Sequence, residues 1–305
     1  MSKLKVRRLL APFSLLLLSA LNPIFLHPSD QGIKISLRIY SGYSYLSAGD
    51  INEGVQGLLE AERWNYTPYW AISESSNTLH GGTDFGADLI IHFNDHLGLS
   101  IGAGMIHSSG SSSHLRTAEY DDRYSALVTH VTELSALPIR VGLFFTRQLT
   151  GRISLTASGG ISYYAPVTFK YTRRSDYYSP PPYNDTWETT SIGAHKNSLG
   201  FQGGLGAEFK VMSKIRLFVE AQGRYARFSE ISNAWRKSVW SWHPIVEAVS
   251  GSLYVRQFTG GSELTFSEII VYEMVPDVVP STEWYRPAKL DLSGFCLLAG
   301  FRIGF

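Results

Sequence analysis

The chain has 305 residues, with 27 Lys and Arg against 26 Asp and Glu, and only 17% of its residues are charged, against about 25% in an average soluble domain. A mean hydropathy of −0.04 excludes a polytopic helical membrane protein, whose spans each need about 20 apolar residues. The single cysteine excludes a disulfide scaffold, and the balanced charge argues against a nucleic-acid binder. The low charge, the 28 glycines and the 13% aromatic content need another explanation.

The N-terminal segment, about residues 1–20, is predicted to be a secretory signal peptide. Four basic residues between Lys3 and Arg8 precede an apolar run from Leu9 to Leu21, which is the order of a signal peptide. Ala20 is a candidate for the residue before the cleavage site, but Leu18 breaks the small-residue pattern and the position stays open. An uncleaved anchor helix is the alternative.

After residue 32, apolar residues recur at every second position in eight segments, with Gly, Ser and charged residues between them. This period is typical of a β-strand with two different faces and not of a helix. The predicted strands cover residues 33–45, 85–93, 97–105, 137–145, 153–163, 199–209, 215–225 and 295–305.

The connections between these segments alternate strictly in length. Short joins at residues 94–96, 147–151 and 211–214 separate long connections at about 47–81, 108–132, 165–197 and 229–288. This alternation predicts an all-β fold: an eight-stranded antiparallel transmembrane β-barrel over residues 33–305, with short periplasmic turns and long extracellular loops. We expect a short amphipathic helix from Gly49 to Trp64 and a hairpin with strands over 253–258 and 264–272. Inserting that hairpin into the membrane would make ten strands.

Aromatic residues lie at matching ends of the predicted strands. Phenylalanines end the strands that run toward the short turns, and tyrosines lie near the long-loop end of three strands that run the other way. They predict the two interfacial girdles of a membrane barrel, formed by Phe93, Phe145, Phe209 and Phe305 on one side and by Tyr43, Tyr163 and Tyr225 on the other.

The inward face of the predicted barrel carries more positive than negative residues. Because isolated charges are costly in a narrow interior, we expect a ladder of ion pairs, with Glu208 near Arg216 and Asp88 facing Arg38. The ladder predicts a structural plug, and a narrow, weakly anion-selective channel is the alternative. Its members are Lys34, Arg38, Asp84, Asp88, Arg140, Arg152, Glu208, Arg216, Glu220, Arg224 and Arg302.

The last segment, FCLLAGFRIGF at residues 295–305, resembles the C-terminal strand of bacterial outer-membrane proteins that the barrel-assembly machinery recognises. The chain is similar as a whole to small outer-membrane barrels of the OmpA, OmpX or OmpW type. The resemblance implies a bacterial outer-membrane location with both termini periplasmic. It also implies contact with outer-membrane lipid and lipopolysaccharide, and with the assembly machinery through the strand ending at Phe305. It transfers no functional residue.

Motifs for chemistry are weak, and we expect neither an enzyme nor a cofactor or metal site. Gly98–Gly102 matches the G-x-S-x-G pattern of a nucleophile elbow, but it lies within a strand rather than at a strand–turn–helix junction. Adjacent His107 and Ser108 are the candidate pair for a lipid-modifying enzyme, and the histidines show no metal-ligand spacing. We expect a structural or surface-interaction role carried by the loops, whose aromatic patches lie at residues 177–183 and at Trp235, Trp240 and Trp242. A narrow porin-like channel for small or hydrophobic solutes is the first alternative.

Overall fold

The computed structural model describes residues 34–66, 70–75, 77–118, 121–179, 183–240, 246–259, 265–273 and 283–305. The predicted signal peptide lies outside the described residues. No helix within them is long and apolar enough to cross a membrane.

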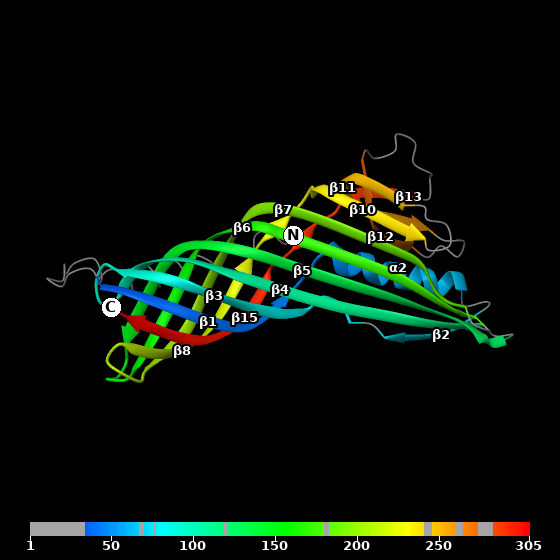
Figure 1. Cartoon of the computed structure of the whole chain (residues 1–305). Coiled ribbons are helices and arrows are strands. Elements are labelled where there is room, and N and C mark those ends of the chain that lie inside the picture. The colour runs from blue at the N-terminus through cyan, green and yellow to red at the C-terminus, as the bar shows by residue number, and fades with distance from the viewer. Residues whose placement is uncertain are drawn as a thin grey trace, which may run out of the picture.

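Eight antiparallel strands close into a barrel (Figure 1). Each strand pairs with the next along the ring, and the last pairs with the first through a register that includes Leu37 opposite Ile303. The eight predicted segments all lie in this ring, so the eight-stranded barrel is confirmed. The ring order is β1 (Lys34–Leu46), β3 (Gly81–His92), β4 (Leu97–Ala118), β5 (Asp121–Gln148), β6 (Ile153–Ser179), β7 (Tyr183–Lys210), β8 (Ile215–Tyr225) and β15 (Gly294–Gly304).

Two of the predicted long loops are in fact largely continuous β-sheet. Strands β4 to β7 have 22 to 28 residues, whereas about 9–11 suffice to cross a membrane. Their outer halves therefore run through the regions 108–132 and 165–197, which the sequence predicted as loops. The inner faces of these extensions bury apolar residues such as Leu134 and Phe169 together with polar ones such as His114, and the outer faces carry polar residues such as Lys170. The outward apolar alternation that marks the membrane part is therefore lost although the strands continue.

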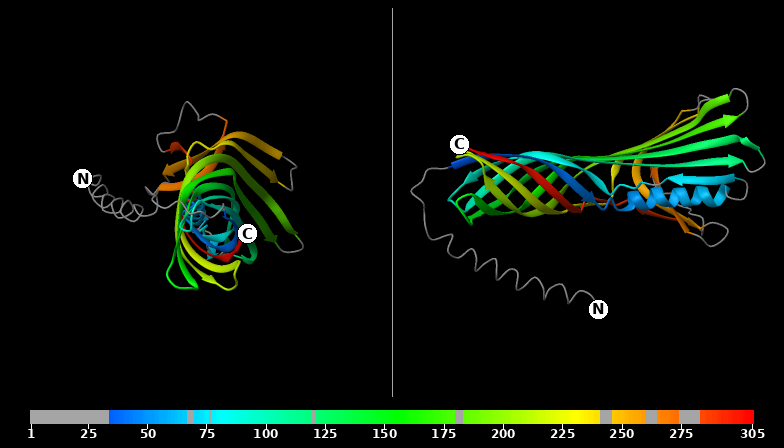
Figure 2. Two further views of the ribbon diagram at one scale, coloured as in Figure 1. Left: turned by 90° about the vertical axis from the view of Figure 1, so that its left-hand side faces the viewer. Right: turned by 90° about the horizontal axis from the view of Figure 1, so that it is seen from below.

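The barrel opens into a curved sheet at the end opposite the short turns (Figure 2). Beyond Ser108, β4 pairs with β2 (Trp70–Ser75) instead of β3, and beyond Phe201, β7 pairs with β10 (Ser232–Trp240) instead of β8. The sheet continues through β11 (Val246–Thr259), which pairs with both β12 (Thr265–Tyr272) and β13 (Glu283–Pro287). We call this outer sheet and its helix the head. The predicted hairpin is confirmed as β11 and β12, and it lies in the head and not in the ring.

Register shifts mark the level at which the barrel widens. One shift falls between Ala136 and Pro138 on β5 and another between Tyr164 and Val167 on β6. These positions are neighbours, because Pro138 pairs with Tyr164. Such bulges bend strands at barrel rims, so they separate the membrane barrel from the head.

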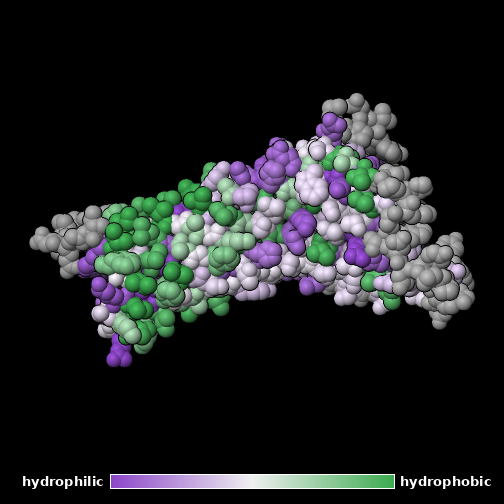
Figure 3. Space-filling model, viewed as in Figure 1, coloured by the Kyte–Doolittle hydropathy of each residue, from purple (hydrophilic) through white to green (hydrophobic). Residues whose placement is uncertain are grey.

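The outer surface of the barrel half is apolar (Figure 3). Leu205 is 71% exposed and Phe305 is 72% exposed, which would be costly in water and suits lipid tails. The predicted girdle side chains Phe93, Phe209, Tyr43, Tyr163 and Tyr225 are also exposed, and Phe145 is half-buried. Phe93 and Phe305 lie just past the strand ends at the short turns, as a girdle requires.

A hydrophobic core closes the barrel at the base of the head. Helix α2 (Asp50–Tyr66) confirms the predicted amphipathic helix and buries Ile51 and Val55 against Ile106, Leu134 and Phe228. The helix packs very close to β12, because a Cβ on Gly57 would lie 2.3 Å from the Ser267 carbonyl oxygen. A glycine is therefore required there. The short strands β9 (Arg227–Phe228) and β14 (Leu290–Asp291) border this core.

Candidate functional site

The inside of the barrel holds ion pairs arranged in levels. Nearest the short turns, Arg302 Nη2 lies 2.5 Å from Glu208 Oε2, and Arg216 approaches the same oxygen at 3.8 Å. The predicted neighbours Glu208 and Arg216 thus meet. Glu208 is almost fully buried, so its charge is neutralised by two guanidinium groups.

The middle and upper levels follow the same principle. Arg38 donates to Glu220 at 2.7 Å, and Arg140 lies 3.2 Å from Asp88. Asp88 lies opposite Arg38 in the strand register as expected, but the closer ion-pair partner of Arg38 is Glu220. At the upper level, on the side of the head, Arg224 donates to Asp84 at 3.1 Å and to Ser44 at 3.0 Å.

Aromatic rings fill the space between these pairs. The Arg38 guanidinium carbon lies 3.9 Å from the centre of the Phe218 ring, and Arg140 lies 5.0 Å from the centre of the Tyr40 ring. Such cation–π contacts add to the ion pairs in a desolvated interior. Tyr40, Phe218, Cys296 and Leu298 form one buried cluster. These inward aromatics were not predicted from the sequence, because small and charged residues were taken as the mark of the inward face.

Two cavities lie along the inside of the barrel. A cavity of about 290 Å³ opens at the short-turn end, lined among others by His92, Arg216 and Arg302. The cavity between Arg38, Asp88, Arg140 and Glu220 measures only about 20 Å³, roughly the room of one water molecule. The ion pairs and the apolar core beneath the head thus lie inside the barrel at two separate levels.

Two predicted members of the ladder lie at its edge. Lys34 is half-exposed and pairs with exposed Asp95 at 3.1 Å, at the short-turn end. Arg152 is exposed in the turn between β5 and β6, so its predicted place inside the barrel is wrong. The period-two pattern failed there because it was extended back to Arg152, one residue before β6 begins at Ile153.

The candidate enzyme pair His107 and Ser108 does not form a pair in the structure. The two residues are adjacent on β4, with His107 exposed and Ser108 buried. The Ser108 hydroxyl donates to the Gly81 carbonyl at 2.7 Å. This arrangement gives no nucleophile–base contact between them.

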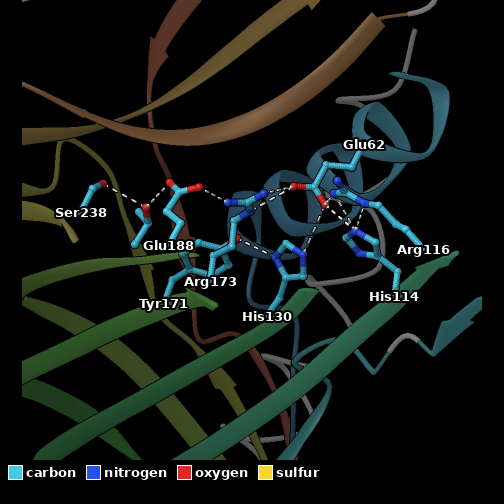
Figure 4. A network of polar contacts seen from close by, with 9 residues as sticks. Glu62, His114, Arg116, His130, Tyr171, Arg173, Glu188 and Ser238 are labelled. Carbon is cyan, nitrogen blue, oxygen red and sulfur yellow. Dashed lines mark hydrogen bonds and ion pairs between the residues drawn. The ribbon is translucent and has the colours of Figure 1, made fainter. Parts of the chain in front are cut away.

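A second polar group is buried in the head, and we call it the head cluster (Figure 4). It brings together one residue of the helix and side chains from four neighbouring strands, all on the inner face of the head sheet. It consists of Glu62 on α2, His114 and Arg116 on β4, His130 on β5, Tyr171 and Arg173 on β6, and Glu188 on β7.

The Glu62 carboxylate is the centre of the head cluster. Arg173 contacts its Oε1 through two nitrogens, at 2.8 and 3.0 Å, and Arg116 lies 3.1 Å from its Oε2. His114 Nε2 lies 2.9 Å from Oε2, and His130 Nε2 lies 3.7 Å from the same oxygen. Because Glu62 is near the C-terminal end of its helix, where the helix dipole disfavours an anion, the charges of Arg116 and Arg173 offset this unfavourable position.

The outer residues of the head cluster hold the central ones in place. Tyr171 OH is 2.7 Å from His130 Nδ1, which fixes the ring so that Nε2 points toward Glu62. Arg173 also donates to Glu188 at 2.8 Å, and Thr190 donates to Glu188 in turn. Glu62, His114, Arg116 and His130 are all buried.

Burial and charge shift the acidity of these groups. Burial alone would raise the pKa of Glu62, but the neighbouring imidazoles of His114 and His130 and the charge of Arg173 bring that pKa well below its usual range. Burial lowers the pKa of His130 despite the opposing pull of the Glu62 carboxylate. The carboxylate is therefore charged and the imidazole of His130 neutral at neutral pH, which is the state in which both can bind a cation.

The head cluster was not predicted from the sequence. His114 and Arg116 are two residues apart, as strand neighbours on one face must be, but they fell in a region predicted to be a loop. His130 was in the same region, and Glu62 was only part of an amphipathic helix. The available signal was the spacing of two between His114 and Arg116, and the structure shows both residues buried with exposed Leu115 between them.

Comparison with known proteins finds similarity in fold only. No protein-family model matches the chain, and no curated protein matches it. Among solved structures, it resembles the outer membrane protein OprG from Pseudomonas aeruginosa, with 10% identity, a TM-score of 0.37 and coverage of 89% of this chain and 95% of that one.

Other solved structures give similar values. The outer membrane protease OmpT from Escherichia coli has 9% identity and a TM-score of 0.36, with coverage of 90% of this chain and 96% of that one. Ail, the attachment invasion locus protein of Yersinia pestis, has 10% identity and a TM-score of 0.28, with coverage of 89% of this chain and 97% of that one. These proteins differ in role, so the similarity assigns none to this chain. The closed ring, the short turns and the apolar belt give the chain the architecture of a small bacterial outer-membrane β-barrel.

Proposed function

We propose that this protein is a non-conducting outer-membrane barrel that holds a rigid β-sheet head at the bacterial surface, and that the head carries its function as an interaction surface. The short turns, the start of β1 and the C-terminus lie at one end (Figure 1), which in this proposal is periplasmic. The observation that carries the proposal is the double obstruction of the barrel, by the ion pairs inside it and by the core beneath α2.

We expect the purified protein to be silent in a planar lipid bilayer at high protein load. The physical reason is that the central space holds roughly one water molecule and that buried ion pairs resist separation. The comparison variant, Arg140→Ala together with Arg38→Ala, loosens the ion-pair level alone, and it should also be silent because the core beneath α2 still closes the barrel. Discrete, reproducible openings of the wild type that disappear in Arg302→Ala would contradict the proposal and support the channel alternative.

The exposed aromatic side chains of the head are the candidate contact points. Trp284 is 53% exposed and Tyr178 is 37% exposed, and tryptophan and tyrosine dominate the binding energy of many interfaces. We expect vesicles that carry the wild-type protein to adhere to its binding surface. Vesicles that carry the double variant Trp284→Ala with Tyr178→Ala should adhere at least roughly tenfold less to the same surface.

The control for this test is Tyr225→Phe, because Tyr225 belongs to the membrane girdle and not to the head. Equal adhesion of the head variant and the control, on every surface that the wild type binds, would show that these aromatics do not form the interaction surface.

A further inference from the structure

The most informative group outside the proposed interaction surface is the centre of the head cluster. Glu62, His114 and His130 come from three different elements, and each offers one ligand atom within 4.8 Å of the other two. All three residues are buried. A carboxylate and two imidazoles form one of the three-ligand sets that bind zinc and leave a fourth position open.

The hydrogen bonding at this centre is incomplete. His114 Nε2 lies 2.9 Å from Glu62 Oε2, an acceptor, and 2.9 Å from Arg116 Nη2, a donor. A lone pair on this nitrogen suits Arg116 and repels the carboxylate, whereas a proton suits the carboxylate and repels the guanidinium. No protonation state of His114 satisfies both contacts.

His130 Nε2 is also unsatisfied. It is buried, has no hydrogen-bond partner among the described residues, and lies 3.7 Å from Glu62 Oε2. The Tyr171 hydroxyl holds the other ring nitrogen, Nδ1, at 2.7 Å. A second contact of this kind typically orients a metal-binding histidine. His130 Nε2 therefore points at the Glu62 carboxylate, with room for a bound ion between them.

Two of the three separations between the ligand atoms are close to those around a small cation. Ligands about 2.0–2.1 Å from a tetrahedral zinc ion lie roughly 3.3 Å from one another. The separations of 2.9 and 3.7 Å from Glu62 Oε2 to the two histidines fall on either side of this value. Arg173 binds the other oxygen, Oε1, whereas Oε2 is contacted by Arg116 at 3.1 Å.

We propose that Glu62, His114 and His130 form a binding site for a divalent transition-metal ion of the zinc type, and that Arg116 acts as its competitor. The Arg116 guanidinium lies 3.1 Å from Glu62 Oε2 and 2.9 Å from His114 Nε2, so it bridges two of the ligands where the ion would bridge them. Metal binding requires Arg116 to withdraw, and the ion then satisfies both histidines and the carboxylate. This inference does not depend on the proposed interaction surface.

The test is titration of chelator-treated, detergent-solubilised full-length protein with Zn²⁺, and with Co²⁺ followed by visible absorption. We expect one ion per chain. His130→Ala should weaken binding at least roughly tenfold, and Tyr171→Phe should weaken it roughly 10–100-fold, as loss of a supporting contact does elsewhere. Arg116→Gln should tighten binding roughly tenfold, a gain that a misfolded variant cannot produce.

The matched control is His107→Ala, an exposed histidine on the same strand as His114, which should bind like the wild type. The proposal is overturned if neither the wild type nor Arg116→Gln binds Zn²⁺. It is equally overturned if His107→Ala removes the binding while His130→Ala does not, since the ion would then sit on the outer surface.

Discussion

Replacing Glu62 by Gln should unfold the head locally while leaving the barrel intact. The substitution keeps the size of the side chain but leaves buried Arg116 and half-buried Arg173 without their shared carboxylate. Removing one partner of a buried ion pair typically costs about 3–5 kcal/mol, because the remaining charge is uncompensated. Glu188 still pairs with Arg173 at 2.8 Å, so the largest loss should appear around Arg116.

Hydrogen exchange followed by mass spectrometry measures this effect directly. The amides of α2 and of the outer halves of β4 to β6 should lose protection, and those of the barrel halves should not. The matched control is Glu60→Gln, an exposed carboxylate on the same helix, which should change protection little. If the two variants exchange alike, Glu62 is not what holds the helix to the sheet.

Replacing Glu220 by Gln should destabilise the barrel itself. Glu220 accepts from Arg38 at 2.7 Å through one oxygen and from Ser158 at 2.8 Å through the other. Arg38 is buried and stacked on Phe218, so it cannot reach water when its partner is lost. We expect the free energy of unfolding in lipid vesicles to fall by roughly 3 kcal/mol, the low end of the range for broken buried pairs, because Asp88 lies opposite Arg38.

Two further variants separate this effect from a general loss of charge. Asp95→Asn removes an exposed pair with Lys34 at the short-turn end and should cost at most about 1 kcal/mol. Adding Arg38→Met to Glu220→Gln should recover part of the loss, since no unpaired charge then remains. Denaturant titrations that give Glu220→Gln and Asp95→Asn the same midpoint would show that the interior pairs are hydrated.

The barrel was predictable because lipid imposes a strict rule on its strands. A residue such as Leu205 must be apolar and its neighbours Gly204 and Gly206 must fit a crowded interior, so the period of two appears in the sequence. The short turns and the girdle residues follow from the same constraint. The ladder residues Arg38, Asp84, Asp88 and Glu220 could be assigned to the interior for this reason.

The head was not predictable in the same way. Its strands have water on one side and a partly polar inner face on the other, so residues such as Ser112, His114 and Arg116 show no apolar alternation. Their convergence with Glu62 depends on where α2 packs, and this is set by the close approach of Gly57 to β12. Exact partners inside the barrel, such as Glu220 for Arg38, depend on the register across the ring.

Labelling of the native Cys296 tests the closed interior most directly. It is the single cysteine of the chain, it is buried among Tyr40, Phe218 and Leu298, and its thiol donates to Gln222 Oε1 at 3.6 Å. The folded protein in lipid vesicles is treated with a charged methanethiosulfonate reagent and weighed by mass spectrometry, with Ser213→Cys in an exposed turn as the positive control. A closed barrel predicts no adduct on the folded wild type, one on the folded Ser213→Cys variant, and one on the unfolded wild type. Rapid modification of Cys296 in the folded protein would contradict the closed barrel.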